Sequence, residues 1–321
     1  MQEKPASLEI NHLYKKTLVN EQGRYFQDFK RELTPRWFIV WSKLLAGHFA
    51  VFAISLCLII LQFIFGWSAV LLIAPGALAL GFVHAYIQLF FHEAAHYNIA
   101  KNRKLNDRLA NCLIGIFVGQ HIDVYRQTHF KHHRSLGTPE DSETTYFDPL
   151  NIRFIVGSLM GIKVIKGLLK QKKSLPLHKK TDANKQLIYG LFLHGIILGG
   201  AILYSAWIFA CAWLVGFLIA FPFFAAVRQV LEHRSFAAKS DVNYYVEPHG
   251  VTNRLFGEGP LASTLGGAGF NRHLLHHWEP KISFTQLGKL EKFLIQTQAR
   301  EIIRRSQTTY IKTFIRLMRS K

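Results

Sequence analysis

Charged residues are absent from two long stretches of this 321-residue sequence, residues 44–91 and 187–227. Gly66-Trp67-Ser68 interrupts the first stretch, and a break near Ser205-Ala206 interrupts the second. Each half approaches the roughly 20 apolar residues that span a bilayer as a helix. The absence of charge argues against buried helices of a soluble protein. It predicts an all-α integral membrane protein with four transmembrane helices in two tight hairpins, at residues 44–65, 69–91, 187–204 and 207–227.

Acidic residues are also scarce, with 20 Asp and Glu against 39 Lys and Arg and a formal net charge of +19. Such an excess suits either nucleic acid or an anionic membrane surface, and the apolar stretches favour the membrane. Every basic residue lies in residues 1–43, 92–186 or 228–321. Because Lys and Arg stay on the cytoplasmic side, we expect both termini and the central segment to be cytoplasmic.

This pattern predicts three consecutive parts of the chain. Residues 1–43 form an N-terminal cytoplasmic segment, residues 44–290 a membrane domain with a cytoplasmic helical cap, and residues 291–321 a basic C-terminal cytoplasmic helix. Within the cap, the mixed apolar and basic residues 152–170 predict an amphipathic helix on anionic lipid, or a helix packed on the rest of the cap. The acidic loop at residues 139–143 is given no chemical role.

Cysteine is rare, and the three cysteines show no paired spacing. Cys57, Cys112 and Cys211 all lie in apolar stretches, so we expect them to be packing residues without a disulfide or metal role.

Histidine, in contrast, is abundant, with 16 residues, and half of them fall in three clusters. Within each cluster the spacing of i, i+3 or i+4 places the imidazoles on one helical face. Three such clusters, all on the expected cytoplasmic side, indicate ligands for metal. They are "HEAAH" (His92, His96), "HFKHH" (His129, His132, His133) and "HLLHH" (His273, His276, His277).

The first cluster alone matches the zinc-protease pattern H-E-x-x-H, in which Glu93 would be the general base. A zinc protease needs only one further ligand, so it has no use for two additional histidine clusters. Eight imidazoles can surround two metal ions, and imidazole suits Zn, Cu, Fe and Ni. The first cluster begins where the second predicted transmembrane helix ends, so we expect the metals at the membrane face, within reach of a lipid chain.

The order and spacing of the three clusters resemble the membrane fatty acid desaturase and hydroxylase superfamily, over about residues 40–290. That family carries H-x(3–4)-H, H-x(2–3)-H-H and a late H-x(2–3)-H-H around four transmembrane helices. The stretch "FNRHLLHHWEPKISF", with Asn271 before the cluster and Pro280 after it, is also similar to the last box of the family. The resemblance implies two iron ions in a non-haem di-iron centre that uses O2 and two electrons to attack a C–H bond of a lipid chain.

The resemblance implies further site residues after the fourth helix. His233 in "RQVLEH" matches a ninth ligand by position. Gln229 resembles the place of an Asn that holds a metal through water in acyl-CoA desaturases, although the residue type differs. Glu93, Asp123 and Glu232 could each orient a ligand imidazole.

The predicted function is a desaturase that introduces a double bond into a fatty acyl chain. The alternative is a hydroxylase or ketolase of the same superfamily acting on a fatty acyl, sphingoid or carotenoid chain, and an intramembrane zinc protease is the third hypothesis. The sequence contains no His-Pro-Gly-Gly box and no cysteine cluster. We therefore expect a separate ferredoxin-like, rubredoxin-like or cytochrome b5 electron donor, for which a basic cytoplasmic face would suit an acidic carrier.

Overall fold

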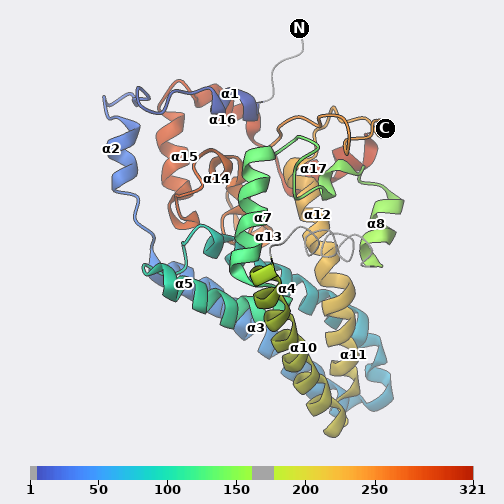
Figure 1. Cartoon of the computed structure of the whole chain (residues 1–321). Helices are drawn as coiled ribbons and strands as arrows, with labels where there is room; N and C mark the ends of the chain where they lie inside the picture. The colour runs from blue at the N-terminus through green and yellow to red at the C-terminus, as the bar shows by residue number, and fades with distance from the viewer. Residues whose placement is uncertain (1–5, 161–176, 321) are drawn as a thin grey trace. The chain divides into compact units, whose positions relative to one another are not determined.

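Residues 6–160 and 177–320 are described by the computed structural model, and within them every regular element is a helix (Figure 1). Two isolated β-bridges, Val19 with Tyr25 and Leu255 with Gln307, are the exceptions to helix and loop in this part of the chain. The predicted all-α class is therefore confirmed.

The chain divides into two compact units, and each is described by itself. Unit 1 consists of Met1–Val40, His129–Leu150 and Arg228–Lys321, and unit 2 consists of Trp41–Thr128 and Asn151–Val227. The division of the sequence into three consecutive parts stays a prediction.

Unit 2 holds the long apolar helices. Its elements are most of α3 (Trp37–Phe65), η1 (Gly66–Leu72), α4 (Ile73–Ala95), α5 (Arg103–Ala110), η2 (Asn111–Gly115), α6 (Ile116–Val118), α8 (Ile152–Leu159), α10 (Leu177–Leu203), α11 (Trp207–Val215) and η4 (Gly216–Ala220). The helices α7 (Ile122–Ser135) and α12 (Phe221–His233) contribute residues to both units.

Three helical stretches are long and apolar enough to cross a membrane: Trp37–Ala95, Lys180–Leu203 and Trp207–His233. They bear out an integral membrane protein, and the count of four spans stays a prediction. Both predicted breaks are present, because α3 ends at Phe65 and α10 ends at Leu203. Two helices extend beyond the predicted spans. The helix α3 begins at Trp37, before the predicted start at residue 44, and α12 continues to His233, past the predicted end at residue 227.

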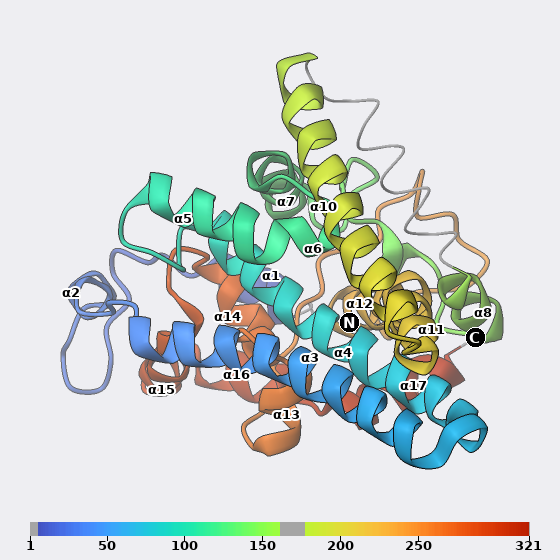
Figure 2. The ribbon, with the colours of Figure 1, turned by 90° about the horizontal axis from the view of Figure 1, so that it is seen from below.

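Small residues let the helices of unit 2 approach closely. The chain turns at Gly66, which has a φ of +57°, and α3 and α4 then run antiparallel (Figure 2). A Cβ added to Gly47 of α3 would lie 2.9 Å from the Ile87 side chain of α4. A Cβ added to Gly81 of α4 would lie only 2.4 Å from the Ala220 Cβ. Close packing through glycine and alanine is the usual way in which membrane helices associate.

Two histidines form hydrogen bonds with the backbone of the apolar segment that follows α5. The Nε2 atom of His48 in α3 lies 2.9 Å from the Leu113 carbonyl oxygen, and the Nε2 atom of His194 in α10 lies 2.9 Å from the Phe117 carbonyl oxygen. Both carbonyls belong to the η2–α6 segment, where the π-helical geometry of η2 interrupts the regular ladder. These histidines are therefore structural and do not join the clusters singled out above.

Two further predictions for this unit, the helix at residues 152–170 and the packing of the cysteines, are not confirmed as they were made. The helix predicted for residues 152–170 is described only as α8, Ile152–Leu159, and residues 161–170 of that prediction lie outside the described residues. The three cysteines are free, as predicted, but each is exposed. The prediction that they are packing residues is therefore wrong, because their helices turn those faces outward.

Unit 1 is built from three separate parts of the sequence. Its elements are α1 (Ala6–Asn11), α2 (Phe26–Arg31), η3 (Thr145–Phe147), α13 (Pro260–Leu265), η5 (Phe270–Arg272), α14 (His273–Trp278), η6 (Phe284–Gln286), α15 (Leu287–Ile295), α16 (Arg300–Ser306) and α17 (Tyr310–Arg319), with the ends of α7 and α12. Phe26 of α2 packs on Trp278 of α14, with ring centroids 4.9 Å apart. Lys15 and Lys30 pair with Glu279 at 3.2 and 2.9 Å. The N-terminal segment thus holds the short helix α14, which carries the last histidine cluster.

Candidate metal centre

Seven histidines of unit 1 come from three helices. They are His129, His132 and His133 of α7, His233 at the end of α12, and His273, His276 and His277 of α14. The i, i+3, i+4 spacing on α7 and α14 places each triplet along one side of its helix. The second and third clusters, far apart in the sequence, are therefore brought together with His233.

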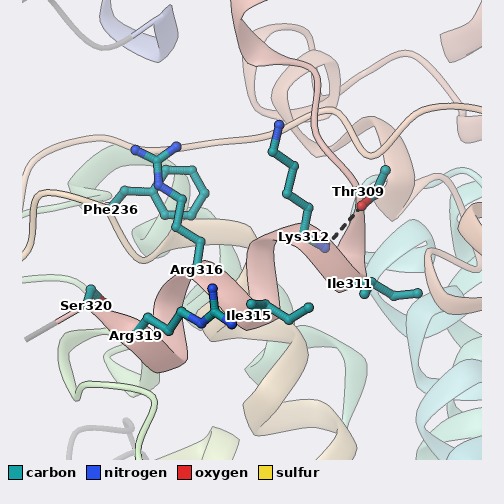
Figure 3. Close-up of a pocket in the computed structure, with 8 residues that line it drawn as sticks. All are labelled: Phe236, Thr309, Ile311, Lys312, Ile315, Arg316, Arg319 and Ser320. Atoms are coloured by element: carbon teal, nitrogen blue, oxygen red, sulfur yellow. Dashed lines mark hydrogen bonds between the residues drawn. The ribbon is translucent and has the colours of Figure 1, made fainter.

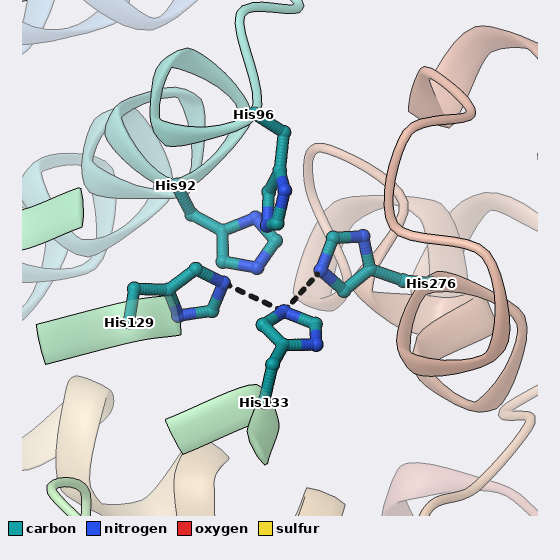
Figure 4. A group of neighbouring side chains, drawn as sticks. All are labelled: His92, His96, His129, His133 and His276. Atoms are coloured by element: carbon teal, nitrogen blue, oxygen red, sulfur yellow. Dashed lines mark hydrogen bonds between the residues drawn. The ribbon is translucent and has the colours of Figure 1, made fainter. Parts of the chain in front are cut away.

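The first group joins α7 and α14. The Nε2 atom of His133 lies 2.9 Å from that of His129 and 3.1 Å from that of His276 (Figure 4). The possible ligand atoms of these three residues all lie within 4.8 Å of one another. His129 is 2% exposed and His276 3%, so two of the three imidazoles are shielded from water, and His133 is partly exposed.

A second group lies around His233. The ligand atoms of His132, His233 and His277 lie within 4.8 Å of one another, and the same limit holds for Glu232, His233 and His273. The His273 Nε2 atom lies 3.0 Å from that of His233 and 3.1 Å from that of His277. Glu232, expected only to orient an imidazole, is buried and places an oxygen 3.7 Å from His273 Nε2. It is thus near enough to act as a ligand itself.

The first histidine cluster belongs to unit 2, at the C-terminal end of α4. The rings of His92 and His96 have centroids 5.2 Å apart, and both are drawn in Figure 4. Glu93 is 1% exposed, and its Oε1 atom lies 3.8 Å from His92 Nδ1. Burial, and then the charge of Arg126, lower the pKa of His96 to about 3. His96 is therefore neutral, which is the form that binds metal.

Arg126 holds the end of α4. Its guanidinium donates to the Ala95 carbonyl at 2.9 Å and to the Ala94 carbonyl at 3.3 Å, and it also pairs with Asp107. Cations at a helix C-terminus satisfy its open carbonyls and complement the helix dipole. Asp123, predicted to orient an imidazole, pairs instead with Arg126 at 2.5 Å. The prediction for Asp123 is therefore wrong.

The acidic loop at residues 139–143 contacts the α7 histidines. Asp141, 2% exposed, accepts from His132 Nδ1 at 2.9 Å and also from the Tyr146 hydroxyl at 2.5 Å. Glu143 lies 3.2 Å from His129 Nδ1. The expectation that this loop has no chemical role is wrong. The sequence signal was present but weak, namely two carboxylates within a few residues of a histidine cluster.

Gln229 lies against the same loop. Its Oε1 atom accepts from the Thr145 backbone N–H at 3.1 Å, and its Nε2 atom donates to Glu143 Oε2 at 2.7 Å. The Gln229 side chain thus positions the Glu143 carboxylate, which in turn contacts His129. A role for Gln229 in holding metal through water stays a prediction.

The hydrogen bonds of the imidazoles decide which nitrogen is available for metal. The Nδ1 atom of His233 lies 3.1 Å from the Thr252 carbonyl oxygen, which can only accept a hydrogen bond. In His129 and His132, Nδ1 faces Glu143 and Asp141. Donation from Nδ1 makes Nε2 the unprotonated nitrogen, which is the one that can bind a metal, as in metal-bound histidines generally.

The protonation tendencies differ among these imidazoles. Burial, and then neighbouring histidines, lower the pKa of His273 and His277 well below the ordinary value, so both are neutral near pH 7. Burial opposes charge on His132, but Glu143 and Asp141 together raise its pKa. Several Nε2 atoms that converge in a buried, acid-backed site suit a divalent cation that accepts imidazole and carboxylate.

A comparison with known protein families bears on this arrangement. The family model described as "Fatty acid desaturase" matches residues 68–309, which is about three quarters of the chain and includes all three histidine clusters and His233. Its members are membrane oxidoreductases that act on lipids. The helical architecture, the apolar spans and the clustered imidazoles agree with that match, and the chain belongs to the fatty acid desaturase family.

Proposed function

We propose that this protein is a desaturase that introduces a double bond into a fatty acyl chain, with O2 and two electrons, at a histidine-ligated di-iron centre. The observation that carries the proposal is the pair of imidazole groups in unit 1 of a fatty acid desaturase family member. Two groups, each with its own converging Nε2 atoms, favour two metal ions over one.

The proposed ligands follow these groups. His129, His133 and His276 hold one iron, and His132, His233, His273 and His277 hold the other with Glu232. His92 and His96 complete the set, because "HEAAH" occupies the place of the first box in the sequence pattern. In this proposal Glu93 is not a general base, and the zinc-protease hypothesis is abandoned because the chain belongs to the desaturase family.

Bound iron would supply the oxidising chemistry that attacks an unactivated C–H bond. The residues of the chain provide the setting for it. Asp141, Glu143 and the Thr252 carbonyl fix the imidazoles with Nε2 inward. Six of the nine proposed histidine ligands are buried, which limits access of water and protects a reactive centre from side reactions. A vicinal pair of hydrogens must be held at the centre for a double bond to form, so positioning of the chain decides the product.

The alternative is a hydroxylase or ketolase of the same family on a fatty acyl, sphingoid or carotenoid chain. The same ligand set serves both reactions, and the difference lies in which carbon is presented. Electrons are proposed to come from a separate ferredoxin-like, rubredoxin-like or cytochrome b5 carrier, with both termini and the active site on the cytoplasmic side.

Lipid profiles of cells with and without the gene test the proposal. We expect chains that have lost two hydrogens to appear only with the gene and only with O2. Products that have gained oxygen instead would replace the desaturase by the hydroxylase alternative.

His277→Ala tests the centre itself. We expect it to abolish the oxygen-dependent product and lower the iron content, because His277 belongs to the second imidazole group. His12→Ala, at an exposed histidine outside the clusters, is the matched control and should change neither. Full activity of His277→Ala, or one zinc per chain and no activity with iron, would overturn the di-iron proposal.

A further inference from the structure

An open pocket of about 780 Å³ lies beside α17 in unit 1 (Figure 3). One face of α17 lines it with Ile311, Lys312, Ile315, Arg316 and Arg319, and Phe236 lies opposite. Neither the sequence pattern nor the proposed chemistry gives this pocket a role.

The helix α17 has two different faces. Tyr310, Thr313 and Leu317 are buried against unit 1. On the other side, Ile311 is 58% exposed and Ile315 is 44% exposed. Exposed isoleucines on one ridge, with cations beside them, are the composition of a helix that lies in a membrane interface.

The positive charge of the pocket is unbalanced. In the part of the chain that the structure describes, no carboxylate pairs with Lys312, Arg316 or Arg319. A fourth cation adds to them, because Phe236 lies between Arg316 and Arg254, whose guanidinium carbons are 4.0 and 4.2 Å from the ring centroid. Burial, and then the charge of Arg316, lower the pKa of Arg254 to about 9. An anion bound in the pocket would reduce the repulsion between these positive charges.

The pocket is also close to the end of a membrane span. The span Trp207–His233 ends three residues before Phe236, and three residues of chain reach at most about 10 Å. Arg254 links the two directly, because it donates to the Leu231 carbonyl at 2.8 Å while its guanidinium stacks on Phe236. The pocket therefore lies beside the polar last turns of α12, which follow the apolar run that ends at Val227.

We propose that the α17 pocket binds the headgroup of an anionic membrane phospholipid. Lys312, Arg316 and Arg319 contact the phosphate, and Ile311 and Ile315 contact the glycerol and upper acyl chains. Exposed isoleucines beside the cations favour a lipid, which offers both an anionic headgroup and acyl chains, and an acidic protein partner is the alternative outcome of the test. The proposal does not depend on the reaction that the histidines perform.

The test uses the full chain in lipid nanodiscs of phosphatidylcholine, with and without about 30% phosphatidylglycerol. A nitroxide is placed at Ile315→Cys in a protein whose three native cysteines, Cys57, Cys112 and Cys211, are replaced by serine. We expect phosphatidylglycerol to raise the collision rate of the label with lipid-soluble O2 and lower that with a water-soluble nickel chelate. At about 0.5 M salt the shift should shrink, because salt screens exposed charges.

Charge variants decide the outcome. Lys312→Gln, Arg316→Gln and Arg319→Gln together should lower the affinity of the pocket for phosphatidylglycerol on the order of 100-fold, since each cation near an anionic surface contributes about fivefold. The change in the two collision rates should then disappear. Lys281→Gln, Lys289→Gln and Lys292→Gln remove as many cations from unit 1 and should leave the response intact. The single variants are measured too, so that misfolding of the triple variant does not decide the result.

Three results would overturn the proposal. The label could report the same environment in both kinds of disc, or the triple variant could respond as the parent does. Alternatively, the charge variants could leave the label unchanged but slow electron delivery from an acidic carrier, which would make the pocket a protein docking site.

Discussion

Asp141 illustrates how a single carboxylate can set the chemistry of a histidine. It is buried, accepts from His132 Nδ1, and is itself fixed by the Tyr146 hydroxyl and the Glu143 backbone N–H. A carboxylate in this position orients the ring and raises the basicity of the opposite nitrogen.

We therefore expect Asp141→Asn to reduce metal affinity by about 10- to 100-fold, the usual cost of losing such a partner. The amide keeps the shape of the side chain but not its negative charge. Iron per chain after dialysis against a chelator measures the effect. Glu140→Gln, at the exposed neighbouring position, is the control and should retain iron. Equal retention by Asp141→Asn would mean that His132 needs no such support.

At the scale of single residues, the sequence predicted the clustered histidines better than their partners. Their helical spacing predicted imidazoles that the structure groups together, and the family resemblance predicted His233, while the role of these residues as metal ligands stays a prediction. Asp141 and Glu143 were missed because their contacts depend on the path of a loop, which has no periodicity to read. Asp123 was wrongly assigned because an arginine three residues along its own helix is the nearer partner.

At the scale of elements, the end of α4 depends on a cation from α7. Arg126→Gln should destabilise this end, because two carbonyls of α4 and the Asp107 carboxylate lose a charged donor. We expect a loss of about 2 kcal/mol in unfolding free energy, with lower iron retention. Chemical unfolding in mild detergent measures it. Arg134→Gln removes an exposed arginine from the same helix and should behave as the parent. Unchanged stability of Arg126→Gln would show that the carbonyls find other donors.

The contact of α4 with η4 gives a second prediction at this scale. Gly81→Ala would place its Cβ 2.4 Å from the Ala220 Cβ and 2.7 Å from the Gly216 carbonyl oxygen. Overpacking of this kind costs about 1–3 kcal/mol, so a lower unfolding temperature is expected. Gly199→Ala, where nothing lies within 4 Å, is the control and should be neutral or slightly stabilised. A Gly81→Ala protein as stable as the control would contradict the close contact.

The breaks between helices were predicted well and the helix ends less well. Gly66 and the Ser205-Ala206 pair interrupt apolar runs, and the structure turns at both places. The helix α12, however, continues past the apolar run to His233, because its polar last turn is satisfied by contacts of unit 1, such as that of Arg254 with the Leu231 carbonyl. Apolarity alone cannot predict such an extension.

At the scale of the whole molecule, orientation in the membrane stays a prediction from the distribution of Lys and Arg. Cysteines introduced as Glu140→Cys and Ser320→Cys, after replacement of the three exposed native cysteines, should be labelled by a membrane-impermeant reagent only in opened cells. Trp67→Cys, in the first hairpin turn, should be labelled in intact cells. Labelling of position 140 or 320 from outside would reverse the proposed topology.

The interleaving of the two units has a consequence for how the protein is made. Unit 1 combines His129–Leu150 with Arg228–Lys321, and a ribosome releases these stretches far apart in time. The apolar helices α10, α11 and α12 are synthesised between the second histidine cluster and the third. A centre built as proposed could therefore be completed only after translation has passed α14, and a nascent chain stalled before His273 would carry the histidines of α7 without those of α14.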